Sequence, residues 1–133
     1  LVGEDNIFIF GLTSEEVLSI YRSGESGSDK LYAQNSVIKK VVDTLIDGTF
    51  SKDHKNLFYD LYQALVFSKN GFADQYLLLR DFESYIKACQ QAQAAFALPD
   101  EWNRKAVINV AKAGYFSSDR TIAEYNRQIW KLK

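Results

Sequence analysis

The sequence contains few of the residues that mark specialised protein classes. Its 133 residues include one proline, one cysteine, one histidine and no methionine. The lone Cys89 excludes an internal disulfide and is compatible with a reducing compartment, so we expect a cytoplasmic protein. Sixteen basic and 17 acidic side chains nearly cancel, so the chain has no strong field to attract nucleic acid or an anionic membrane. Its apolar runs are too short to cross a bilayer.

What is present is the composition of a globular domain. Hydrophobic residues make up 47% of the chain and charged residues 25%, which is typical of folded rather than disordered proteins. The length suits one domain, and we assign residues 1–133 to it. The first residues have neither the basic nor the apolar region of a secretory signal. The missing methionine and the early apolar segment favour an excerpt from a longer protein.

Apolar periodicity predicts a mainly helical chain. Thr13 followed by Glu16 has the spacing of a capping box, and Pro99 is suited to a first helical position. Residues 23–29 form a Gly/Ser-rich loop, and Asn70–Gly71 is typical of a turn. The pattern predicts about six helices, at residues 13–22, 35–47, 57–68, 81–97, 99–113 and 118–130.

One short segment predicts a strand at the N-terminus. Ile7 to Phe10 is β-branched and aromatic, ends at Gly11 and shows no polar alternation. Such a run is typical of a strand buried on both faces in a parallel sheet that helices cover. The chain offers no convincing partner strand, and a buried lone strand would leave its backbone groups unpaired. We therefore expect the rest of the sheet to lie outside this sequence.

The histidine, the cysteine and the acidic residues do not form a pattern that is typical of a catalytic or metal-binding site. His54 lies in a polar stretch and is interpreted as a solvated loop residue, whereas Cys89 continues an apolar stripe and is interpreted as a core residue. Glu15–Glu16 suits a helix N-terminus. Asp81 and Glu83 are two residues apart at a helix start, so their side chains point in different directions. The sequence predicts no catalytic, cofactor-binding or metal-binding residue.

The C-terminal segment allows two interpretations. Gly114 is placed to end a helix in the left-handed conformation, and Ser117–Asp119 offers oxygens that can cap the next one. Hydroxyls and N–H groups at a helix start can also hold phosphate, and the Arg120 guanidinium could donate two parallel hydrogen bonds to it. The hydroxyls are already needed as caps, which favours the capping interpretation. The new helix has an apolar stripe made of Ile122, Tyr125 and Ile129, widened by Trp130.

Four ordered segments carry a resemblance to a known family. They are Gly3–Gly11 (GEDNIFIFG), Tyr76–Lys87 with its core DFESYIK, Glu101–Trp102, and Lys112–Tyr125 (KAGYFSSDRTIAEY) followed by Ile129–Trp130. Together they resemble the C-terminal part of the α-glucan phosphorylases, which act on glycogen, starch or maltodextrin. The resemblance covers nearly the whole chain but only the end of such an enzyme.

The resemblance implies a fold and an activity for the parent enzyme. Phosphorylases release glucose 1-phosphate from α-1,4-glucan with phosphate, and they bind pyridoxal 5′-phosphate on a lysine between two Rossmann-like domains. That lysine lies upstream of the segment that Gly3–Gly11 resembles, so none of the eleven lysines here matches it. The resemblance implies that Ile7–Phe10 belongs to the second Rossmann-like sheet. It also implies that residues 118–130 form a closing helix that runs toward the first domain.

We therefore hypothesise a mainly α segment with about six helices and one strand, the C-terminal part of a Rossmann-like α/β domain. It would be inactive alone and would have the remainder of a phosphorylase as its partner. Isolated, it could form a homodimer through Ile7–Phe10 or through the Ile122 stripe. The alternative is a separately encoded helical interaction module with a phosphorylase-like ending. A self-contained small enzyme has little support, because no set of reactive residues converges.

Overall fold

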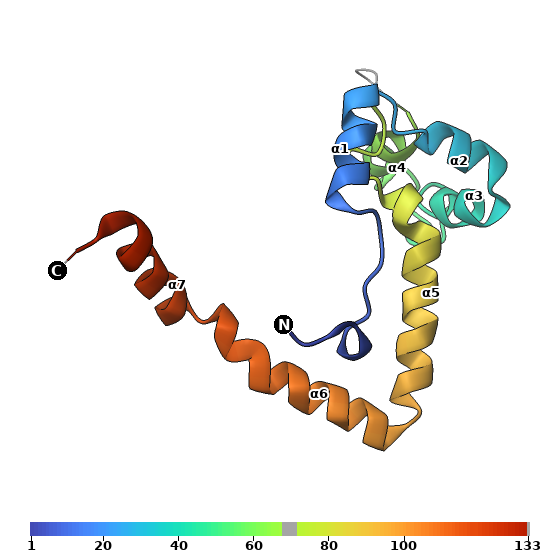
Figure 1. Ribbon diagram of the computed structural model, residues 1–133. Helices are drawn as coiled ribbons and strands as arrows, with labels where there is room; N and C mark the ends of the chain where they lie inside the picture. The colour runs from blue at the N-terminus through green and yellow to red at the C-terminus, as the bar shows by residue number, and fades with distance from the viewer. Residues whose placement is uncertain (68–71, 133) are drawn as a thin grey trace. The chain divides into compact units, whose positions relative to one another are not determined.

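A computed structural model describes residues 1–67 and 72–132 (Figure 1). This part of the chain contains seven α-helices and no strand. It divides into two compact units, one made of residues 10–87 and the other of Leu1–Ile9 with the chain from Ala88 onward. The helices are α1 (Ser14–Ser23), α2 (Ser28–Gln34), α3 (Ser36–Asp43), α4 (Tyr59–Val66), α5 (Leu78–Phe96), α6 (Pro99–Ala113) and α7 (Ser118–Tyr125).

The predicted strand is wrong, and with it the assignment to a Rossmann-like α/β domain. Ile7 closes a short 3-10 helix, η1 (Glu4–Asn6), and residues 8–10 have no regular structure. Ile7, Ile9 and Phe10 are exposed, so this segment is not buried on both faces. β-Branched and aromatic residues favour a strand only where a neighbouring strand accepts their backbone hydrogen bonds. The described residues supply no such neighbour.

The unit of residues 10–87 is built around α2, α3 and α4. Its core consists of Ile38, Val42, Tyr62, Val66 and Leu79, all buried. Figure 1 shows α2 and α3 packed beside each other, and α4 also contacts α2. Helix α2 is absent from the sequence-based prediction, because seven residues are too few for a periodic pattern. The predicted helix at 35–47 is shorter than expected and ends as α3 at Asp43.

Local capping determines where several of these helices begin. Thr13 caps α1 through the predicted box, in which Glu16 Oε2 accepts from the Thr13 N–H at 2.7 Å. Asn35 Oδ1 accepts from the N–H groups of Val37 and Ile38 and so starts α3. Helix α4 ends at Val66. The predicted helix end near Ser68 and the predicted turn at Asn70–Gly71 fall on residues outside those that the structure describes.

In the other unit, the N-terminal segment lies on α6. Lys105 donates to the carbonyl of Asp5, and Asn109 Nδ2 donates to that of Asn6 at 2.8 Å. The Phe8 ring stacks on Trp102 with centroids 6.4 Å apart. Lys105 and Asn109 of α6 thus bind the backbone of η1, and Phe8 packs on Trp102 beside these hydrogen bonds.

The end of α6 differs from the prediction in one respect. Gly114 has φ −55°, a right-handed conformation, and continues into a 3-10 turn, η2 (Gly114–Phe116). The predicted left-handed Gly114 is therefore wrong. Helix α7 follows and passes into a π-helical turn over Asn126–Trp130, so the segment 118–130 is helical throughout. No described residue of α6 or α7 is buried.

Candidate functional site

The N-terminus of α7 is the place where the sequence allowed an anion site. Ser117 Oγ accepts from the Arg120 N–H at 3.3 Å, so this hydroxyl acts as the cap. The Arg120 guanidinium donates to the Tyr115 carbonyl, lies 4.0 Å from the centre of the Tyr115 ring and places Nη1 2.6 Å from Glu124 Oε2. A phosphate would have to displace a carboxylate that already neutralises this arginine. The geometry favours capping over anion binding.

A second cluster joins three helices through a tyrosine hydroxyl. Tyr32 on α2 donates to Asp43 Oδ1 at 2.5 Å, and Lys39 Nζ donates to Tyr32 Oη at 3.1 Å and to Asp43 Oδ2 at 2.6 Å. Tyr62 on α4 lies 3.0 Å from Tyr32 Oη. Because Tyr32 gives its only proton to Asp43, Tyr62 is the donor of this last bond. The cluster ties α2, α3 and α4 together next to the apolar core.

The titration of this cluster is that of a structural network rather than of a catalytic one. Burial, followed by the hydrogen bond to Asp43, raises the pKa of Tyr32 to about 12. The hydrogen bonds from Lys39 and Tyr32 lower the pKa of Asp43, and those to Asp43 and Tyr32 raise the pKa of Lys39. A general acid or base works best with a pKa near the operating pH. The shifts move the pKa values of Tyr32 and Lys39 further above neutral pH.

Asp74 is a buried carboxylate that the sequence analysis overlooked. Its side chain accepts from Ser28 Oγ at 2.9 Å and from the N–H groups of Leu78 and Leu79 at 2.9 and 2.8 Å. It therefore caps α5 and fixes the start of α2 at the same time. A carboxylate just before a run of leucines was the available signal, but its distance of 46 residues from Ser28 hid the contact.

The other candidate residues also take part in local structure. Asp81 Oδ1 accepts from the Leu12 N–H at 3.0 Å, and Glu83 Oε1 accepts from Asn35 Nδ2 at 2.9 Å. His54 is exposed on the loop after α3, and Cys89 is half-buried on α5. Within residues 1–67 and 72–132, no three histidine, cysteine or acidic side chains lie together so that they could hold a metal ion.

Two of the described lysines, Lys39 and Lys105, lack the surroundings of a lysine that binds pyridoxal phosphate covalently. A lysine forms a Schiff base as the free amine, which requires a lowered pKa and an enclosed pocket. The pKa of Lys39 is instead raised by Asp43. Among the lysines that form ion pairs, Lys105 has the most covered side chain, and its ammonium donates to the Asp5 carbonyl and lies 3.4 Å from Glu101 Oε1. The expected absence of a cofactor site on this chain remains a prediction.

No described helix combines the length and the apolar content that crossing a membrane would require.

Comparison with known proteins gives one consistent match. The family model described as carbohydrate phosphorylase matches residues 1–132. A maltodextrin phosphorylase from Streptococcus pneumoniae is 40% identical over 133 residues, and a glycogen phosphorylase from Bacillus subtilis is 38% identical over 132 residues. The muscle form of glycogen phosphorylase from Homo sapiens is 36% identical over 131 residues.

The matched region is nearly all of this chain but only a small part of each relative. They include 98% to 99% of this chain but only 15% to 17% of those three proteins. The chain therefore spans about a sixth of the length of the curated relatives that it matches, and these relatives come from both bacteria and a mammal.

Proposed function

Because the chain belongs to the carbohydrate phosphorylase family, we propose that it is the C-terminal structural segment of an α-glucan phosphorylase. The parent enzyme would use phosphate to release glucose 1-phosphate from α-1,4-linked glucan in the cytoplasm. The observation that carries the proposal is a match along residues 1–132 to proteins about six times longer. The partner of this chain is then the remainder of the phosphorylase.

The geometry supports a structural role for these residues. Polar side chains such as those of Asp74 and Ser117 cap helices. Asn109 and Lys105 hold the backbone of the N-terminal segment. Pyridoxal phosphate, where the parent enzyme binds it, would supply an acid–base phosphate group. The resemblance places the cofactor lysine upstream of residues 3–11, so we expect it in the rest of the enzyme.

The proposal predicts that the purified chain has no phosphorylase activity. Incubated with maltodextrin and phosphate, it should release no glucose 1-phosphate, with or without added pyridoxal phosphate, because the reacting groups lie elsewhere. A coupled assay with a phosphorylase of known activity as the positive control makes this measurement. Turnover above the blank would show that the chain contains its own reaction centre.

The genomic sequence upstream of Leu1 separates the proposal from the alternative of a separately encoded helical module. A continuous reading frame that carries the phosphorylase body supports the structural segment. A stop codon followed by a start site at this segment would refute it and favour the module.

A further inference from the structure

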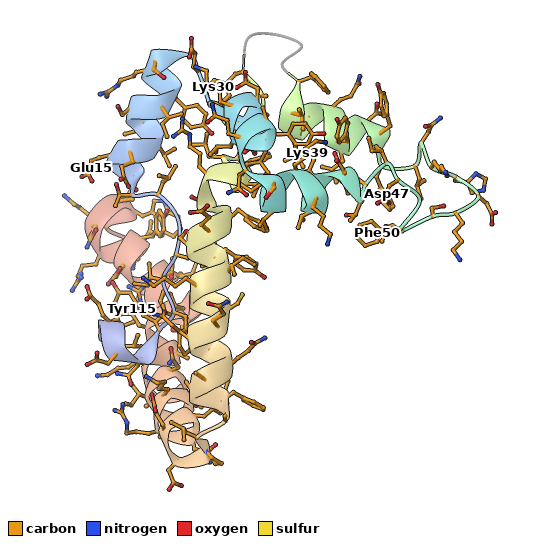
Figure 2. The ribbon with its side chains drawn as sticks, turned by 90° about the vertical axis from the view of Figure 1, so that its right-hand side faces the viewer. Glu15, Lys30, Lys39, Asp47, Phe50 and Tyr115 are labelled. Carbon is orange, nitrogen blue, oxygen red and sulfur yellow. The ribbon has the colours of Figure 1, made fainter. Side chains whose placement is uncertain are left out.

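The N-terminal segment of residues 1–9, which we call the strap, lies on α6 with little burial. Its short helix η1 lies beside α6 (Figure 2). Lys105 and Asn109 donate hydrogen bonds to its backbone carbonyls, and the Phe8 ring stacks on Trp102. No residue of the strap or of α6 is buried. Exposed hydrogen bonds with few buried apolar groups are typical of segments that open locally.

Packing around the strap is loose. Hollows of about 360, 340 and 250 Å³ border it, and strap residues line all three. The other walls of these hollows come from α5, α6 and η2 and from the turn between α5 and α6. A group beside a void lacks attractive contacts on that side. The strap therefore gains less from dispersion than a closely packed segment of the same length would gain.

One polar group of the strap lacks a hydrogen-bond partner while the strap lies on α6. Asn6 Nδ2 donates to the Val2 carbonyl at 2.8 Å. Asn6 Oδ1, in contrast, is shielded from solvent and accepts no hydrogen bond from any described residue. A buried acceptor without a donor raises the free energy of the state that buries it. Opening of the strap would expose this oxygen to water and remove that penalty.

The chain directly after the strap is anchored to α5. The Gly11 N–H donates to Ser84 Oγ at 2.9 Å, and the Leu12 N–H donates to Asp81 Oδ1 at 3.0 Å. Gly11 has φ 89°, a conformation that glycine adopts without strain. The strap can therefore leave α6 while the residues that follow it keep their hydrogen bonds to α5.

We propose that the strap is a conformational device with two states, closed on α6 and open, and that opening leaves the helices folded. Lys105 and Asn109 are the positioning residues of the closed state, because their side chains hold the backbone of η1. When the strap opens, Trp102 loses Phe8 but keeps its edge contact with Phe96, whose ring centre lies 5.1 Å away. The contact between the ends of α5 and α6 is thus independent of the strap.

Native-state hydrogen exchange of the full chain, followed by NMR, tests the proposal. The amides of Asn6 and Ile7 donate the backbone hydrogen bonds of η1, whereas Ala88 and Ala95 are buried residues of α5 in the same unit. The η1 amides should exchange at least about 100-fold faster than the α5 amides, yet more slowly than in an unfolded chain. Low concentrations of urea should accelerate exchange of the α5 amides and leave the η1 amides nearly unaffected, because local opening exposes little surface.

Two asparagine variants of α6 separate strap opening from a general loss of stability. Asn109→Ala should accelerate exchange of the η1 amides by about fivefold, because one hydrogen bond to the strap is lost. It should leave exchange of the α5 amides unchanged, which a variant that destabilised the whole unit would not do. Asn103→Ala is the matched control, because Asn103 is exposed and its side chain makes no hydrogen bond with any described residue. It should change neither rate.

The proposal is overturned if the η1 amides exchange at the rate of the α5 amides, since the strap would then open only when the unit unfolds. Exchange of the η1 amides at the rate of an unfolded chain would also overturn it, since the closed state would not exist. Equal effects of Asn109→Ala and Asn103→Ala would refute the positioning role of Asn109.

Discussion

At the scale of single residues, the Tyr32 hydroxyl makes three hydrogen bonds to side chains of its unit. On α2, it lies between a carboxylate and an ammonium from α3 and a second phenol from α4. Hydrogen bonds to charged groups contribute more than neutral ones. Tyr32 therefore links the docking of α2 to the ionisation state of its neighbours.

We predict that stability declines at alkaline pH because of Tyr32. Its pKa in the folded chain is about 12, above the ordinary value of 10.0. The folded state therefore binds the proton more tightly, and the resulting stability is present below pH 10 and is lost as pH rises through 12. Tyr32→Phe should lower the free energy of unfolding by about 1 kcal/mol at pH 7. The variant should also lose less of its free energy of unfolding than the native chain as pH rises from 10 toward 12.

Urea unfolding at a series of pH values between 8 and 11.5 measures both effects. Tyr59→Phe is the control, because Tyr59 is an exposed tyrosine in the same unit and stacks on Tyr62 through its ring alone. Equal alkaline slopes for the native chain and Tyr32→Phe would contradict the assignment.

At the scale of helices, α5 depends on a cap that comes from outside its own first turn. Asp74 accepts from two of the first free N–H groups of α5 and from Ser28, which begins α2. Its φ of 50° lies in the left-handed region, which aspartate and asparagine tolerate better than most residues. The Asp74 side chain thus caps α5 and also holds the Ser28 hydroxyl at the first residue of α2.

We predict that Asp74→Ala lowers the free energy of unfolding by about 2–3 kcal/mol, because buried donors lose their acceptor and alanine is strained at this φ. Asp74→Asn should cost less, since its amide oxygen still accepts and asparagine keeps the conformation. Thr13→Ala, which removes an exposed cap, should cost about 1 kcal/mol. Denaturant unfolding followed by circular dichroism ranks the three variants. A loss for Asp74→Ala no larger than that for Thr13→Ala would refute the double role.

At the scale of the whole molecule, the C-terminal helical segment has an apolar stripe without cover among the described residues. Ile122, Tyr125, Ile129 and Trp130 are each exposed by between 47% and 63%. Exposed apolar stripes of this kind mark interaction surfaces. In the proposed parent enzyme the remainder of the phosphorylase would cover it.

We predict that the isolated chain self-associates through this stripe. The other surface suggested by the sequence, edge pairing of Ile7–Phe10, is withdrawn because that segment is not a strand. Sedimentation velocity over a range of concentrations should show a shift toward dimer. The double variant Ile122→Lys with Ile129→Lys should reduce the shift, and Val107→Lys on α6 is the exposed apolar control. A native chain that stays monomeric at high concentration would disprove the prediction.

Local sequence was sufficient wherever a short-range interaction decides the structure. The Thr13–Glu16 box, Asn35 before α3, Pro99 at the start of α6 and Ser117 before α7 all act over three or four residues. Hydrophobic spacing likewise placed most of the helices, because an apolar stripe is a property of one element. The four family segments are also linear in the chain, so they could be recognised without a structure.

Only the tertiary structure decided the features that depend on distant residues. Ile7–Phe10 has the composition of a strand, but hydrogen bonds to a neighbour define a strand, and no neighbour exists among the described residues. The cluster around Tyr32 and the hydrogen bond from Ser28 to Asp74 join groups on different elements, 7 to 46 residues apart. Backbone conformation such as that of Gly114 followed the packing of the next turn rather than residue preference. Sequence determined the family and the helices, whereas packing determined which polar groups meet.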